Sequence, residues 1–293
     1  MRRLLLAALL LAPAARAAET ASVLELPIGA RAVALGGAGT ALADDATALY
    51  WNPAGLAALE KKDAVFSHAE LAESTRLDFG GYGAPALGGT VGAGFTYLSH
   101  GSISGRDSLG RPTAGFGASD AALMLGYAHK EDEGLAGITF KYLRSHIAEA
   151  EAQSVAVDVG VKRAEGSHTA AVAVRNIGPG LKYVDQTNDL PLAISAGLGW
   201  KRETLTFGFD YEYRPRVGQN DAGAGVEWEA KTGVFLRGGY STKGAIGGGS
   251  GLDAAKGLAF GLGVKFGVLR VDYAIKPTGE LGRVHRFDVG ARF

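Results

Sequence analysis

The sequence predicts an all-β protein, a 14-stranded antiparallel transmembrane β-barrel with a short N-terminal helical plug. Three observations predict this fold. Apolar residues alternate with small or charged residues over most of the chain after residue 62. The alternating segments are about as long as strands that cross a bilayer, and short connections take turns with long ones. The chain has 45 glycines among 293 residues. This content agrees with an all-β fold, because glycine disfavours long helices.

Composition excludes several classes of protein. There is no cysteine, which excludes disulfide frameworks, zinc fingers and thiol catalysis. Lys and Arg together number 30, as do Asp and Glu, so the basic excess of a nucleic-acid binder is missing. The six histidines are scattered without metal-ligand spacing, and no catalytic motif is present. We therefore expect no enzyme activity, no cofactor, no metal site and no nucleic-acid partner.

Residues 1–17 have the form of a secretory signal peptide. Arg2 and Arg3 precede an apolar run over residues 4–12, and residues 15–17 read Ala-Arg-Ala, an A-x-A cleavage site. No apolar run of 18 residues follows. We therefore expect the signal peptide to direct the chain to the outer membrane of a diderm bacterium, where it contacts membrane lipid.

Residues 18–62 do not alternate and are compact, apolar and rich in glycine, which predicts a plug segment for the barrel lumen. Glycine permits close backbone approach or positive φ. Asp44 or Asp45 can cap a short helix that ends at Trp51, an interpretation preferred to a calcium site because no loop of oxygen ligands follows. Asn52 can cap a second helix that starts at Pro53. The residues predicted to form the plug motif are Gly36, Gly37, Gly39, Asp44, Asp45, Asn52 and Pro53.

Residues 63–293 are predicted to form the barrel. The connections after even-numbered segments are tight, whereas several after odd-numbered segments are long: residues 99–117, 178–190, 242–256 and 277–283. Short turns at one end and long loops at the other are typical of outer-membrane barrels. The 14 segments are roughly 63–70, 75–83, 89–98, 118–129, 134–144, 153–163, 167–177, 191–201, 203–213, 220–229, 232–241, 257–266, 268–276 and 284–293.

Alternation alone leaves open which face of the strands is inside. In a soluble sandwich the apolar face would form the core, whereas in a membrane barrel it would meet lipid. Aromatic residues near the segment ends favour the barrel, because such barrels carry aromatic girdles at both interfaces. These residues are Trp200 and Trp228 toward the short-turn end, and Tyr97, Tyr142, Tyr213 and Tyr240 toward the long-loop end.

The charged face would then line the lumen. Positive and negative side chains are mixed along it, so ion pairs that hold plug and barrel together are one interpretation, and a polar pathway or a docking surface for cargo is the other. The predicted lumen-facing charges are Asp158, Asp210, Glu212, Arg270, Asp272, Arg286 and Arg292. The last strand ends at Phe293, and this ending resembles the signal that the barrel-assembly machinery recognises, which makes that machinery an expected partner.

The stretch GARAVALGGAGTALADDATALYWNPAGLA, over residues 29–57, resembles the N-terminal signature of the FadL-like superfamily, specifically its PorV/PorQ branch. The matching pieces are residues 29–31, the glycine pair 36–37, residues 43–46 and residues 51–56. Residues 271–287 also resemble that branch. The resemblance implies an outer-membrane barrel of 14 strands that serves one of two purposes.

The first purpose is protein export or surface delivery of the type IX secretion kind, with secreted cargo proteins as partners. The alternative is a FadL-like channel for uptake or export of hydrophobic small molecules, with a hydrophobic ligand as partner. A purely structural barrel is a third reading. The sequence favours the first reading and leaves the other two open.

Overall fold

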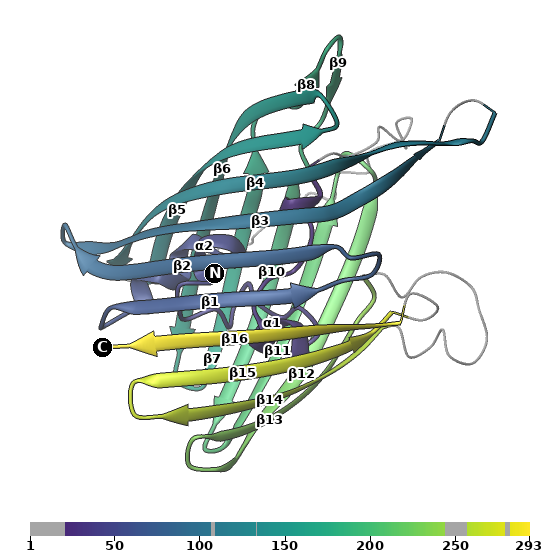
Figure 1. Ribbon diagram of the computed structural model, residues 1–293. Helices are drawn as coiled ribbons and strands as arrows, with labels where there is room; N and C mark the ends of the chain where they lie inside the picture. Colours follow the sequence, from purple (N-terminus) through teal and green to yellow (C-terminus); the bar gives the residue numbers. More distant parts are fainter. Residues whose placement is uncertain (1–20, 107–108, 133, 244–256, 279–281) are drawn as a thin grey trace.

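In a computed structural model, the chain forms a closed barrel of antiparallel strands around an N-terminal segment (Figure 1). The structure describes residues 21–106, 109–132, 134–243, 257–278 and 282–293. Fourteen strands close the barrel, since β1 pairs with both β2 and β16, and a separate hairpin, β8–β9, stands outside this ring. The predicted fold class and strand number are confirmed. The signal-peptide prediction lies outside the described residues.

Each barrel strand covers most or all of a predicted segment, and several strands, β3 and β4 above all, extend beyond it. The helices are η1 Ser22–Leu24, α1 Ala30–Ala34, α2 Ala48–Trp51 and η2 Pro53–Ala58, of which η1 and η2 are 3₁₀-helices. The strands are β1 Asp63–Glu70, β2 Arg76–Ala86, β3 Gly89–Arg106, β4 Pro112–Glu131, β5 Gly134–Ile147, β6 Ala150–Glu165, β7 His168–Ile177, β8 Leu181–Tyr183, β9 Gln186–Asn188, β10 Ala193–Arg202, β11 Leu205–Arg214, β12 Gln219–Lys231, β13 Val234–Ser241, β14 Leu258–Phe266, β15 Leu269–Pro277 and β16 Arg283–Arg292.

The apolar face of the strands points outward. In β6, Val161 is 55% exposed, whereas Asp158, on the opposite face, is 0% exposed. The same arrangement holds in β10, where Leu198 is exposed and Ser195 is buried. A continuous exposed apolar surface fits a bilayer rather than water, so the outward orientation selects the membrane barrel over the soluble sandwich. Of the helices in the described residues, none is long and apolar enough to cross a membrane.

Two predicted long loops are partly strand. Residues 99–117 were expected to form a loop, but β3 and β4 continue through most of this range as a hairpin that projects beyond the barrel (Figure 1). The loop over residues 178–190 contains the short hairpin β8–β9. Both predictions are wrong in this respect, because strand pairing outside the bilayer needs backbone hydrogen bonds but no alternating apolar face.

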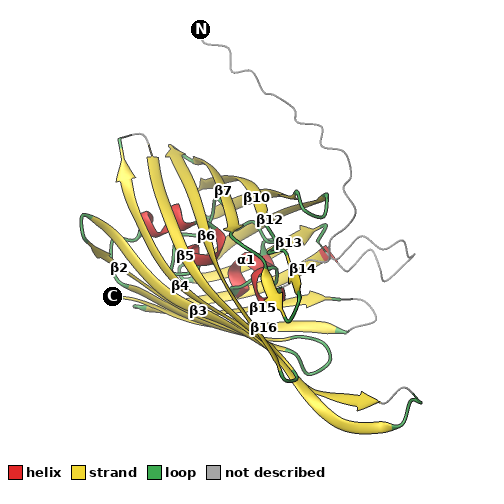
Figure 2. Ribbon diagram, turned by 90° about the horizontal axis from the view of Figure 1, so that it is seen from above, coloured by secondary structure: helices red, strands yellow, loops and turns green. Residues whose placement is uncertain are grey.

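Residues 21–62, here called the luminal segment, run inside the ring of strands, where Figure 2 shows the helices enclosed. A barrel of 14 strands is wider than the eight-stranded barrels that side chains alone can fill, so additional chain is needed to fill its lumen. Asn52 is the N-cap of η2 and accepts a hydrogen bond from the Ala54 nitrogen, and Pro53 is the first residue of that helix.

The N-cap of α2 is Thr47 and not Asp44 or Asp45, so that prediction is wrong. Asp45 instead accepts hydrogen bonds from the backbone nitrogen and the hydroxyl of Thr47. The other carboxylate oxygen of Asp45 accepts from Arg270 of the barrel wall. Asp45 therefore lies two residues before the N-cap of α2 and binds the wall.

Candidate functional site

The luminal segment touches the barrel wall backbone to backbone, because glycines on both sides leave room. A Cβ at Gly36, where φ is +70°, would lie 2.3 Å from the Tyr240 carbonyl oxygen. A Cβ at Gly239 of β13 would lie 2.4 Å from the Gly36 nitrogen, and one at Gly39 would lie 2.3 Å from the Trp51 ring. Side chains essentially never approach so closely, so glycine is required at these contacts. Gly37 also has a positive φ of 87°.

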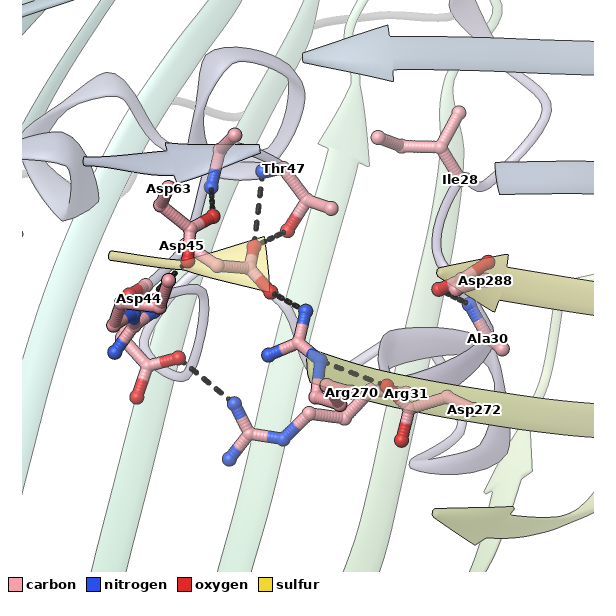
Figure 3. A network of polar contacts seen from close by, with 12 residues as sticks. Ile28, Ala30, Arg31, Asp44, Asp45, Thr47, Asp63, Arg270, Asp272 and Asp288 are labelled. Atoms are coloured by element: carbon pink, nitrogen blue, oxygen red, sulfur yellow. Dashed lines mark hydrogen bonds and ion pairs between the residues drawn. The ribbon is translucent and has the colours of Figure 1, made fainter. Parts of the chain in front are cut away.

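An ionic network joins the luminal segment to the wall at the short-turn end (Figure 3). Arg270 of β15 donates to Asp45 over 2.6 Å, and Asp63 of β1 accepts from the Ala46 nitrogen over 2.9 Å. Burial alone would raise the pKa of Asp45, but Arg270 and the Thr47 hydroxyl outweigh it and lower this pKa to about 2. Asp45 is therefore ionised at neutral pH. Asp44 is half exposed and accepts from Arg31 over 2.9 Å.

A second set of contacts also joins the luminal segment to the wall. Arg31 forks onto both oxygens of Glu227 at 2.9 Å each, and Arg237 links Glu227 to Asp272 at 2.7 Å each. Backbone nitrogens of the segment also bind carboxylates of the wall: Ala30 binds Asp288 and Thr40 binds Asp210.

Of the predicted lumen-facing charges, Asp210, Arg270 and Arg292 bind the luminal segment directly. Asp158, Glu212 and Asp272 instead pair with basic residues of the wall. The ion-pair interpretation therefore holds in part, because ion pairs join the segment to the wall and also join the wall strands to one another.

Another ionic cluster lies where β6 and β7 shift register. Of its three residues only Asp158 is among the predicted lumen-facing charges. Lys141 of β5 forms an ion pair with Asp158 over 2.6 Å and donates to Asn176 over 2.8 Å, and the Asn176 nitrogen donates to Asp158. All three side chains are buried. The signal was in the sequence, since Phe140 and Tyr142 face outward and so place Lys141 inward.

The remaining predicted residues occupy distinct places. Glu212 joins an ion-pair group at the long-loop end, where it accepts from Arg175 and Lys243. Arg286 is 2% exposed, whereas the Arg292 side chain is 39% exposed at the short-turn mouth and binds Asp63 over 2.9 Å. Phe293 is exposed, and its nitrogen donates to the Lys62 carbonyl. Within the described ranges no group of three or more acidic or histidine side chains could hold a metal ion.

A cavity of about 450 Å³ lies at the long-loop end, between the luminal segment and the wall. Tyr50, Trp51, Leu26 and Val33 of the luminal segment give it apolar and aromatic surfaces, and the backbone of Gly36 and Gly37 also lines it. Its volume is in the range of small-molecule sites. The sequence predicts Trp51 only as a helix end, because the wall strands that complete the cavity are far away in the chain.

Ion pairs surround this cavity. The Arg175 guanidinium lies 5.4 Å from the centre of the Tyr50 ring and 5.8 Å from that of Trp51, which is cation–π geometry. Arg214 of β11 pairs with Glu25 and with Asp221. Glu25 precedes α1, so this pair attaches the first part of the luminal segment to the wall beside the cavity.

Two comparisons with known proteins give matches. The model of a family described as "Uncharacterised protein family (UPF0164)" matches residues 13–97, which include the N-terminal motif. The structure is similar to the toluene transporter TbuX of Ralstonia pickettii, with a TM-score of 0.65 and 13% identity over 91% of this chain and 98% of that one. The toluene transporter TodX of Pseudomonas putida gives a TM-score of 0.61 and 12% identity, over 91% and 96%.

No curated protein sequence matches the chain. At these identities the structural likeness shows the fold alone, a barrel like those of the two toluene transporters. Neither match identifies the PorV/PorQ branch, which stays a prediction. The structural neighbours are transporters rather than enzymes.

Deletion of residues 27–60 is expected to leave a barrel that still inserts into membranes but conducts ions more strongly. The strand ring closes through its own hydrogen bonds, while the deleted residues fill the lumen and supply partners of some lumen charges, such as Arg270 and Asp210. Single-channel recording in planar bilayers measures the conductance, and heat-modifiable gel mobility checks that the barrel is folded. Conductance equal to that of the intact chain would contradict a plug at residues 18–62.

Proposed function

We propose that the chain is an outer-membrane channel that binds a hydrophobic small molecule in the long-loop-end cavity and passes it across the membrane. The cavity carries this proposal: it is large enough for a small ligand, and aromatic and aliphatic side chains of the luminal segment line it. The outward apolar face supports a place in the outer membrane, since the interior is polar and the exterior is not.

Similarity to TbuX and TodX, both described as toluene transporters, supports the same function class. The luminal segment has to move or loosen for a molecule to leave the cavity, since its backbone lies against the glycines of β12 and β13. Protein export of the PorV/PorQ kind stays a prediction without a structural observation of its own. A purely structural barrel is disfavoured by the cavity.

Replacement of Ser241 by tryptophan is expected to reduce toluene uptake. Ser241 lines the cavity from the end of β13, so an indole ring there competes for the ligand's space. We expect a loss of at least about tenfold, which corresponds to about 1.4 kcal/mol of binding free energy. Uptake of radiolabelled toluene by a diderm host that produces the chain measures this effect.

Tyr240→Trp is the matched control, because Tyr240 is the neighbouring residue and its side chain is exposed on the outer face. It should leave uptake unchanged. Wild-type uptake by a correctly folded Ser241→Trp barrel would rule the cavity out as the binding site. The absence of any uptake above an empty host by the unmodified chain would argue against toluene-like ligands altogether.

A further inference from the structure

Two cations at the long-loop end lack a carboxylate partner within the described residues. The Arg286 guanidinium makes no hydrogen bond or ion pair to another described residue, and its Nε is fully enclosed. Lys276 donates one hydrogen bond, over 3.3 Å, to the backbone carbonyl of Lys243. The other buried arginines near the cavity, Arg175 and Arg214, both pair with carboxylates.

Strand register brings these two cations together. Arg286 of β16 pairs with Ala274 of β15, and Lys276 lies two residues further along β15 on the same face. Such diagonal neighbours are about 7–8 Å apart, within reach of long side chains. The charges that act on Lys276 are those of Lys243, Arg286 and Asp221, so two of the three repel it.

The nearby acidic groups are engaged in full or in part. Asp221 binds Arg214 and Gln219. Asp288, whose charge acts on Arg286 without contact, accepts from the Ala30 nitrogen through Oδ2 over 2.5 Å, and its Oδ1 makes no hydrogen bond. Lys243 pairs with Glu212 over 3.1 Å. A buried guanidinium that makes no hydrogen bond or contact ion pair is costly, and Lys276 also lines the cavity. An anion between Lys276 and Arg286 would offset both charges.

We infer that Lys276 and Arg286 form a binding site for an oxyanion at the cavity wall. Phosphate fits the site by charge, since a doubly charged anion matches two cations that present several N–H donors. The oxyanion can be free in solution, or it can be the head group of an amphipathic molecule whose tail occupies the cavity. This site does not depend on the transport proposal, because it would bind a free anion even in a closed barrel.

Calorimetric titration of the purified full chain in a zwitterionic detergent tests the site, with inorganic phosphate and octyl phosphate as probes at constant ionic strength. We expect both to bind. Tighter binding of octyl phosphate than of phosphate would assign the site to a head group, and equal binding would assign it to the free anion. If neither probe binds, the inference is wrong.

Lys276→Gln and Arg286→Gln should each weaken binding by at least about tenfold, because each removes a charge-assisted hydrogen bond. Lys276→Arg keeps the positive charge and should bind the probes about as tightly as the unmodified chain does. Lys201→Gln, a change at an exposed lysine near the short-turn end of β10, is the control for general charge effects. Arg286 is buried, so Arg286→Gln can impair folding. Lys276 is only partly buried near the end of β15, so the test depends on Lys276→Gln. Unchanged binding by a folded Lys276→Gln variant contradicts the site.

Discussion

Gly239→Val is expected to push the luminal segment off the barrel wall and to open the lumen to ions. A Cβ at this position would meet the backbone of three residues of the segment, at 2.4 Å from the Gly36 nitrogen, 2.5 Å from the Leu35 carbonyl carbon and 2.7 Å from the Ala34 oxygen. Backbone atoms cannot rotate aside as a side chain can. Overpacking in a well-packed interior costs about 1–3 kcal/mol of stability, occasionally more. Displacement of the luminal segment from β13 removes this steric cost.

The predicted result is a conductance several times that of the unmodified chain in planar bilayers. Gly238→Val is the matched control, since a Cβ at Gly238 would have nothing within 4 Å. Both variants add the same side chain to the same strand, so β propensity changes alike, but only the valine at position 239 points toward the luminal segment. If the two variants conducted equally, the close packing of the luminal segment against β13 would not be what closes the barrel.

Lys141→Met is expected to destabilise the barrel by about 3–5 kcal/mol, because it leaves Asp158 as a buried charge without its counterion. The pair is fully enclosed, with 2.6 Å between Nζ and Oδ2. Denaturation by urea, followed by the fraction that keeps its heat-modifiable gel mobility, measures the loss. The midpoint should fall well below that of the unmodified chain.

Addition of Asp158→Asn to Lys141→Met should recover part of the lost stability, since asparagine carries no charge and keeps an acceptor for the Asn176 nitrogen. Arg144 lies on the same strand as Lys141, and its ion pair with Glu151 of β6 is exposed. Arg144→Met should therefore leave the midpoint unchanged. A midpoint for Lys141→Met equal to the wild-type value would show that the buried pair does not stabilise the barrel.

Strand positions were predictable because each strand carries its own local pattern. In β6, alternate valines define one face, and Asp158 and Lys162 lie on the other. The projecting hairpin of β3 and β4 could not be found in this way, since residues 99–117 are mostly small and polar. The outcome for the helix caps was mixed: Asn52 caps η2 through a contact two residues away, whereas Asp45 is drawn to Arg270, 225 residues away in the chain.

The sequence by itself determined the number of strands, their order and the two faces of each strand, because turns and period-two alternation depend on neighbouring residues. Only the tertiary structure decided which glycines of the wall receive the luminal segment and how the charges pair. Arg31 and Glu227 are 196 residues apart, and Lys276 and Arg286 become neighbours only through the register of β15 and β16. The cavity likewise exists only once the barrel closes around the segment, since no single stretch of chain contains both of its walls.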